Sequence, residues 1–181
     1  MTRKLLAVLI LAALAATPTH AQAQLSTSFG VAGGLSAPMG DLKDITDAGY
    51  NLAAHVNLGA PLIPVGIRLE LGYNSFNAKR ILSTTGKVKI ISGTANATLA
   101  LGPTGASPYL IGGVGIYNRD YTDVGTTSNS KSVGGVNGGA GFRFPLGVIS
   151  TFIEARYHVM LGNTTDGTNL KFVPVTFGIN F

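Results

Sequence analysis

The chain has 181 residues, no cysteine and a formal net charge of +5. Disulfides and cysteine-based metal sites are therefore excluded, and the charge is too small to indicate a nucleic-acid partner. Charged residues make up only 12% of the chain and glycines number 25, a composition that is unusual for a water-soluble domain and suits strands that lie in a membrane.

The first residues predict a secretory signal peptide. Arg3 and Lys4 precede an apolar run from Leu5 to Ala16, and small residues then lead to Ala23. The run is shorter than the roughly 20 residues that a membrane-spanning helix needs. We expect residues 1–23 to be removed after Ala23, or alternatively after Ala21, which lowers the net charge from +5 to +3. Residues 24–181 should then form one domain.

Alternation of apolar and polar residues predicts eight strands in this domain. Each reaches the roughly 9–11 residues that a tilted strand needs to cross a bilayer. The connections are alternately long and short, which is typical of an up-and-down barrel with short turns at one membrane face. In chain order the predicted strands are Leu25–Ser36, Tyr50–Ala60, Val65–Asn74, Val88–Leu101, Pro108–Tyr117, Val133–Phe144, Val148–Leu161 and Leu170–Phe181.

The stretch VGIRLELGY, from Val65 to Tyr73, shows the two faces of such a strand. One row is aliphatic and aromatic, and the other carries Arg68 and Glu70 between glycines. A soluble lipocalin-like barrel would turn the apolar row inward. Here the charged rows of the chain are too sparse, and too mixed in sign, for an ordinary solvated surface. We therefore predict the inverted arrangement, with apolar side chains toward lipid and charges toward the lumen.

The C-terminal stretch KFVPVTFGINF has apolar residues at alternate positions and ends at Phe181. With the predicted signal peptide and the eight strands, it makes the chain resemble the small eight-stranded outer-membrane β-barrels of Gram-negative bacteria, of the OmpX and OmpA-barrel kind. The stretch APMGDL, from Ala37 to Leu42, is also similar to one in this group. The resemblance implies an all-β, eight-stranded antiparallel up-and-down transmembrane barrel in the cell outer membrane. It also implies Phe181 as the signal that the barrel-assembly machinery reads.

Closure follows from the membrane setting. An open sheet edge would leave backbone N–H and C=O groups unpaired in hydrocarbon, so the first and last strands must pair. If the turn at Pro145–Gly147 pairs Phe144 with Ile149, then Gly139 faces Glu154 and Asn137 faces Arg156, while Gly141 faces Phe152. Small residues on one strand would thus make room for bulky ones on the next.

Five charged residues lie on inward rows and define the candidate interior charge network. Unpaired buried charges would each cost several kcal/mol, so we expect these residues to pair and fill the lumen as a polar plug. They are Arg68, Glu70, Arg143, Glu154 and Arg156.

The extracellular loops offer the other candidate surfaces. The segment Asn118–Ser132 is the longest predicted loop, and a basic loop lies near the outer rim, where lipopolysaccharide phosphates are concentrated. The alternative for this basic loop is that it is solvated and has no partner. Its candidate phosphate contacts are Lys79, Arg80, Lys87 and Lys89.

The leading functional hypothesis is a non-enzymatic role in envelope integrity, or in surface interaction through the loops. We expect a porin-like monomer with outer-membrane lipid and lipopolysaccharide as partners, and no cofactor, metal or catalytic residue. Two alternatives remain open: a narrow channel or conduit for small hydrophobic molecules, and a lipid A-modifying hydrolase centred on His158 near Glu154. Both mature histidines, His55 and His158, lie on inward rows.

Overall fold

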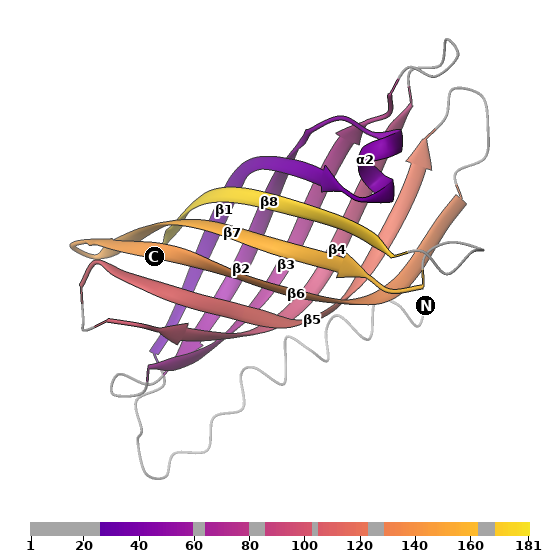
Figure 1. Ribbon diagram of the computed structural model, residues 1–181. Helices are drawn as coiled ribbons and strands as arrows, with labels where there is room; N and C mark the ends of the chain where they lie inside the picture. The colour runs from indigo at the N-terminus through magenta and orange to yellow at the C-terminus, as the bar shows by residue number, and fades with distance from the viewer. Residues whose placement is uncertain (1–25, 60–63, 80–85, 103–104, 123–128, 163–168) are drawn as a thin grey trace, which may run out of the picture.

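The computed structural model describes residues 26–59, 64–79, 86–102, 105–122, 129–162 and 169–181. In these residues eight antiparallel strands form one closed barrel, as the sequence predicts, and one short helix, α2, spans Asp41–Ile45 (Figure 1). The strands are β1 Ser26–Met39, β2 Gly49–Gly59, β3 Val65–Asn77, β4 Lys87–Ala100, β5 Ser107–Thr122, β6 Asn129–Leu146, β7 Ile149–Met160 and β8 Leu170–Asn180.

The barrel closes through β1 and β8, which confirms the predicted pairing of the first and last strands. The two strands pair from Gly30 with Asn180 to Met39 with Lys171. Each remaining strand pairs with its neighbour in sequence, so no crossover is needed. We call the end that carries α2 the loop end and the opposite end, which carries the C-terminus, the turn end (Figure 1). Among the described residues, no helix is long and apolar enough to cross a membrane.

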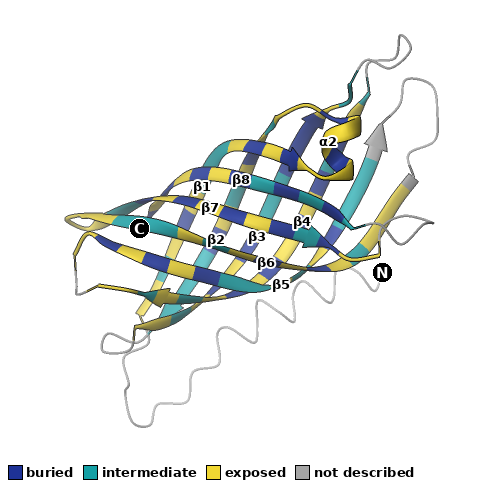
Figure 2. Cartoon of the chain, in the orientation of Figure 1, coloured by how far each residue is buried: buried dark blue, intermediate teal, exposed yellow. Residues whose placement is uncertain are grey.

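The two faces of the wall have the inverted polarity that the sequence predicts. On β3, Leu71 is 69% exposed and Ile67 is 52% exposed, whereas Arg68 between them in sequence is completely buried. Exposed and buried residues alternate along the other strands in the same way (Figure 2). Because the exposed rows are apolar and the buried rows carry the charges, the outer surface of the barrel is suited to lipid.

Strands β5 and β6 extend well beyond their predicted ends. Their pairing continues past Tyr117 opposite Val133 to Arg119 opposite Lys131, so the segment predicted as the longest loop is partly a hairpin. Asn118 Nδ2 donates to Ser132 Oγ over 2.9 Å, and Ser130 Oγ donates to Asn118 Oδ1 over 2.9 Å. The extension lacks apolar alternation because it rises above the lipid-facing band, which is why the pattern alone did not predict it.

The predicted register between β6 and β7 is wrong by two residues. Leu146, not Phe144, lies opposite Ile149, because the chain turns at Gly147 and Val148, and Gly147 has the positive φ of 69° that a tight hairpin requires. Gly141 therefore faces Glu154 and Gly139 faces Arg156, while Asn137 faces His158. A shift of two residues keeps every side chain on its predicted face.

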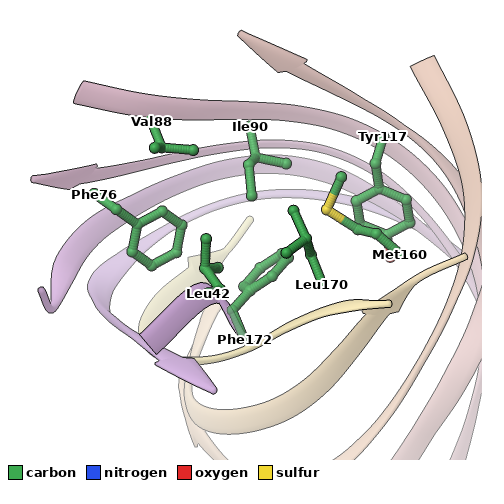
Figure 3. Packing of buried hydrophobic residues seen from close by; sticks show 8 residues of the cluster. All are labelled: Leu42, Phe76, Val88, Ile90, Tyr117, Met160, Leu170 and Phe172. Carbon is green, nitrogen blue, oxygen red and sulfur yellow. The ribbon is translucent and has the colours of Figure 1, made fainter. Parts of the chain in front are cut away.

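The lumen is polar only in part, whereas the sequence predicts a polar plug throughout. At the loop end a fully buried apolar cluster joins β3, β4, β5, β7 and β8, and Leu42 of α2 reaches into it (Figure 3). The helix thus covers the mouth of the barrel with one aliphatic side chain. The cluster consists of Leu42, Phe76, Val88, Ile90, Tyr117, Met160, Leu170 and Phe172.

Replacing Leu69 with Arg should test the outward orientation of this row. Leu69 is 45% exposed and lies midway along the lipid-facing row of β3, so a charge there should destabilise the barrel by about 2–4 kcal/mol. The matched control is Asn77→Arg on the same strand and face at the loop end, which should cost about 0–1 kcal/mol. Denaturant unfolding from phospholipid vesicles measures both, and equal losses would contradict the assigned membrane position.

Candidate functional site

The centre of the lumen holds a chain of four charged side chains from β3 and β7. Arg68 Nη1 donates to Glu154 Oε2 over 2.9 Å, and Arg156 Nη2 donates to Glu70 Oε1. Arg156 Nε also lies 2.7 Å from Glu154 Oε1, an ion pair whose atoms are not aligned for a hydrogen bond. Two arginines and two glutamates thus neutralise one another in a region where the side chains are at most 6% exposed.

The fifth predicted member, Arg143, lies apart from this chain of ion pairs. It is half-buried, and its guanidinium carbon lies 5.4 Å from the centre of the Tyr109 ring. The ring of Tyr109 separates Arg143 from the ion pairs, because the Tyr109 hydroxyl donates to Glu154 Oε2 over 2.6 Å. The structure therefore brings together four of the five predicted residues and gives Arg143 an aromatic neighbour instead.

Polar and aromatic residues that the sequence analysis did not single out complete the network. Asn57 Oδ1 accepts from Arg68 Nε over 2.8 Å, and the Arg68 guanidinium carbon lies 5.0 Å from the Phe152 ring centre. Tyr109 fits because it crosses Gly141, where an added Cβ would lie 2.5 Å from the tyrosine ring. The glycines of β6 are the sequence signal for this close approach.

The two histidines lie at different heights in the lumen. His55 Nε2 is 2.8 Å from Asn180 Oδ1, below the ion pairs toward the turn end. His158 lies above them, where Nδ1 is 2.9 Å from the Tyr117 hydroxyl and the ring stacks on Phe172 at 4.8 Å. Each is only 4% exposed. Neither imidazole reaches the lipid-facing surface.

The described rim lysines lie at the loop end, and two of them, Lys87 and Lys89, are on an outward row. Lys87 and Lys89 continue the row of β4 beyond Ile91, and Lys79 follows β3, where its Nζ donates to the carbonyl of Lys43. Arg80 lies outside the described residues, as do residues 1–25, which include the predicted signal peptide.

The predicted assembly residue, Phe181, directly follows β8. Its backbone N–H donates to the carbonyl of Phe29 and its carbonyl accepts from Phe29 N–H, while its side chain is 62% exposed.

In the part of the chain that the structure describes, no group of three histidine, aspartate or glutamate side chains could hold a metal ion.

Comparison with protein families matches residues 9–181 to the outer membrane protein beta-barrel domain. The chain belongs to this family. The family and the fold place it in the outer membrane, and because the strand bounds leave the longer connections at the loop end, we assign that end to the extracellular side and the turn end to the periplasm.

Solved structures of the same architecture are similar to the chain in fold. Neisserial surface protein A matches with a TM-score of 0.66 and 13% identity, covering 86% of this chain and 97% of that one. A major outer membrane protein from Thermus thermophilus matches with a TM-score of 0.52 and 15% identity, covering 86% and 98%. The N-terminal barrel domain of Pseudomonas aeruginosa OprF matches with a TM-score of 0.50 and 16% identity, covering 87% and 100%. Among curated proteins, none matches the chain.

Replacing Glu154 with Gln should strongly destabilise the barrel. Glu154 pairs with both Arg68 and Arg156 and accepts from Tyr109, so its neutralisation leaves buried positive charge without compensation, at a cost of about 3–5 kcal/mol. Lys43→Gln, on the exposed side of α2, is the control and should change stability by less than about 0.5 kcal/mol. The temperature of the heat-induced mobility shift on gels compares the two, and an unchanged Glu154→Gln barrel would contradict the assigned network.

Proposed function

We propose that this protein is a non-conducting, non-enzymatic outer-membrane barrel that binds lipopolysaccharide at its extracellular rim and so stabilises the outer leaflet. The observation that carries the proposal is the outward row of β4. It is apolar as far as Ile91, which is 57% exposed, and then continues with Lys89 and Lys87. In this proposal, the change from hydrocarbon to ammonium groups marks the height where the acyl chains of the outer leaflet give way to phosphates.

A second strand, β8, shows a similar change. Its outward row changes from Val173 to Lys171 toward the loop end. Lysine acts as a flexible point charge that suits phosphate oxygens. Lysines near the loop end of two separate strands, β4 and β8, favour a layer of anionic head groups over a single soluble ligand.

The side chains that fill the lumen favour a barrel that does not conduct ions. The ion pairs of Arg68, Glu70, Glu154 and Arg156 join β3 to β7, and the apolar cluster around Leu42 fills the extracellular end. An ion that entered would have to displace both layers. An eight-stranded barrel has an interior only wide enough for side chains to fill, which favours the same conclusion.

The position of His158 supports a non-enzymatic role. A hydrolase that acts on lipid A needs its base at the lipid face or the rim, whereas this ring is stacked on Phe172 inside the lumen. Its hydrogen-bond partner is the Tyr117 hydroxyl rather than a serine.

The exposed ring of Phe181 at the periplasmic end supports recognition by the assembly machinery during insertion. We propose that the protein is a monomer in the membrane.

Planar bilayers that contain the purified protein should stay silent. The expected result is the absence of discrete current steps at moderate voltage, with a known porin in the same bilayer system as the positive control. Regular single-channel steps that scale with protein concentration would contradict the non-conducting barrel and would favour the narrow channel.

Changing both Lys87 and Lys89 to Gln should weaken lipopolysaccharide binding without unfolding the barrel. Each lysine near an anionic surface contributes about 1 kcal/mol, so the pair should lower affinity about thirtyfold, and the effect should shrink as salt concentration rises. Binding of purified lipopolysaccharide to the barrel in phosphatidylcholine nanodiscs measures this change.

The charge-matched control is the double change Lys43→Gln and Lys131→Gln. It removes the same charge from α2 and from the inward row of β6, away from the outward rim. Equal losses in the two double variants would mean that net charge, rather than the rim lysines, governs binding.

A further inference from the structure

The extracellular third of the lumen is lined by apolar side chains that face one another across the barrel. We call this region the upper chamber and define it by Phe76, Val88, Ile90, Met160, Leu170 and Phe172, each at most 2% exposed. Leu42 lies among them and belongs to α2 rather than to the wall (Figure 3). The wall residues of this packed cluster therefore surround a side chain that comes from a separate segment of the chain.

The floor of the upper chamber carries polar atoms that have no hydrogen-bond partner among the described residues. They are Asn137 Nδ2 and Oδ1, Arg156 Nη1 and His158 Nε2. All three residues are more than nine-tenths buried, with exposures of 7%, 4% and 4%. Asn137 lies directly opposite His158 in the β6–β7 pairing, and the His158 ring contacts Phe172 of the chamber. Buried groups of this kind carry a substantial desolvation cost unless a partner satisfies them.

The arrangement of these atoms favours an anionic partner. Arg156 uses Nε and Nη2 on Glu154 and Glu70, so Nη1 is the part of its guanidinium that is directed to neither carboxylate. When the Tyr117 hydroxyl donates to His158 Nδ1, the ring proton lies on Nε2, which then is a donor. Arg119 and Lys131, opposite each other above the chamber, also place positive charge on the inward rows at its mouth.

We propose that the upper chamber is a binding site for a small amphiphilic monocarboxylate with an aromatic or short hydrocarbon body. The carboxylate accepts hydrogen bonds from Arg156 Nη1, His158 Nε2 and Asn137 Nδ2, and the apolar body occupies the space that Leu42 fills in this structure. This site goes beyond the proposed lipopolysaccharide rim, which lies on the outer face of the wall. It is a blind site rather than a conduit, because the ion pairs close the lumen below it.

The attachment of α2 allows Leu42 to be exchanged for a ligand. The helix has five residues, and Leu42 is its buried residue. At its start Gly40 has a φ of 53° and provides no side-chain cap, whereas after its end Thr46 forms a β-bridge with Ala78. The helix is held on both sides, because Met39 before it pairs with Lys171 and Thr46 after it bridges to Ala78, so the ligand displaces the Leu42 side chain rather than the whole helix.

The methionines provide a direct readout of this site. Met160 lies in the chamber, whereas Met39 is on the outward row and 40% exposed. With methyl-¹³C methionine in the full barrel in phosphatidylcholine nanodiscs, titration with 4-phenylbutanoate should shift the Met160 resonance saturably and leave Met39 in place. Met160→Leu assigns the signal. The alcohol of the same carbon skeleton, 4-phenylbutan-1-ol, should bind about tenfold more weakly, because it lacks the charged acceptor.

Three variants then separate the head-group site from the chamber. Leu42→Ala should tighten binding of both compounds, since it frees the space for the apolar body. His158→Phe keeps the stacking on Phe172 but removes both ring nitrogens, and it should weaken the carboxylate about tenfold and the alcohol, a neutral acceptor, by less. Asn137→Leu should act in the same direction and carries the test if His158→Phe does not fold, as judged by heat-modifiable migration.

The proposal would be overturned by a Met160 resonance that does not saturate in either wild type or Leu42→Ala. It would equally be overturned if Met160 and Met39 shifted together, which indicates partition into the lipid. A carboxylate preference that both head-group variants leave unchanged would exclude the assigned donors.

Discussion

The structure depends on one constraint: within hydrocarbon, each backbone N–H and C=O group must find its partner inside the protein. The pairing of β1 with β8 meets this constraint by removing the open edge of the sheet. Once the wall is closed, its outer face meets lipid and its inner face meets the lumen. Period-two alternation then gives each strand one apolar row and one polar row. The exposed Leu71 and the fully buried Arg68 on the same strand are the direct consequence.

A closed wall then imposes a second condition on the lumen. An eight-stranded barrel has little interior space, so charges that point inward must be neutralised by one another. Two arginines and two glutamates from β3 and β7 do so in the middle of the lumen, where Tyr109 also donates to Glu154. Above them the same inward rows become apolar, and Leu42 fills the remaining space. The lumen therefore holds a charged layer of ion pairs and an apolar layer above it. The unpartnered atoms of Asn137 and His158 lie near the border between the two layers.

The outward face of the wall also changes from apolar to charged toward the loop end. As far as Ile91 the outward row of β4 is apolar, and beyond it the row continues with Lys89 and Lys87. The proposed lipopolysaccharide rim and the proposed carboxylate site are separate in space, since the first lies on the outward row of the wall and the second lies inside the lumen. The two proposals therefore concern opposite faces of the same part of the wall.

The number of strands, their facing and the closure of the barrel can be predicted from the amino-acid sequence, because alternation and strand length follow directly from the contrast between lipid outside the wall and polar groups inside it. The sequence also placed Arg68, Glu70, Glu154 and Arg156 in the lumen. Only the tertiary structure decided which of these residues pair, because a register shift of two, as between β6 and β7, leaves every facing unchanged. The separation of Arg143 by Tyr109, the extension of β5 and β6, and the insertion of Leu42 likewise depend on contacts between segments distant in sequence. Periodicity within one strand carries no information about such contacts.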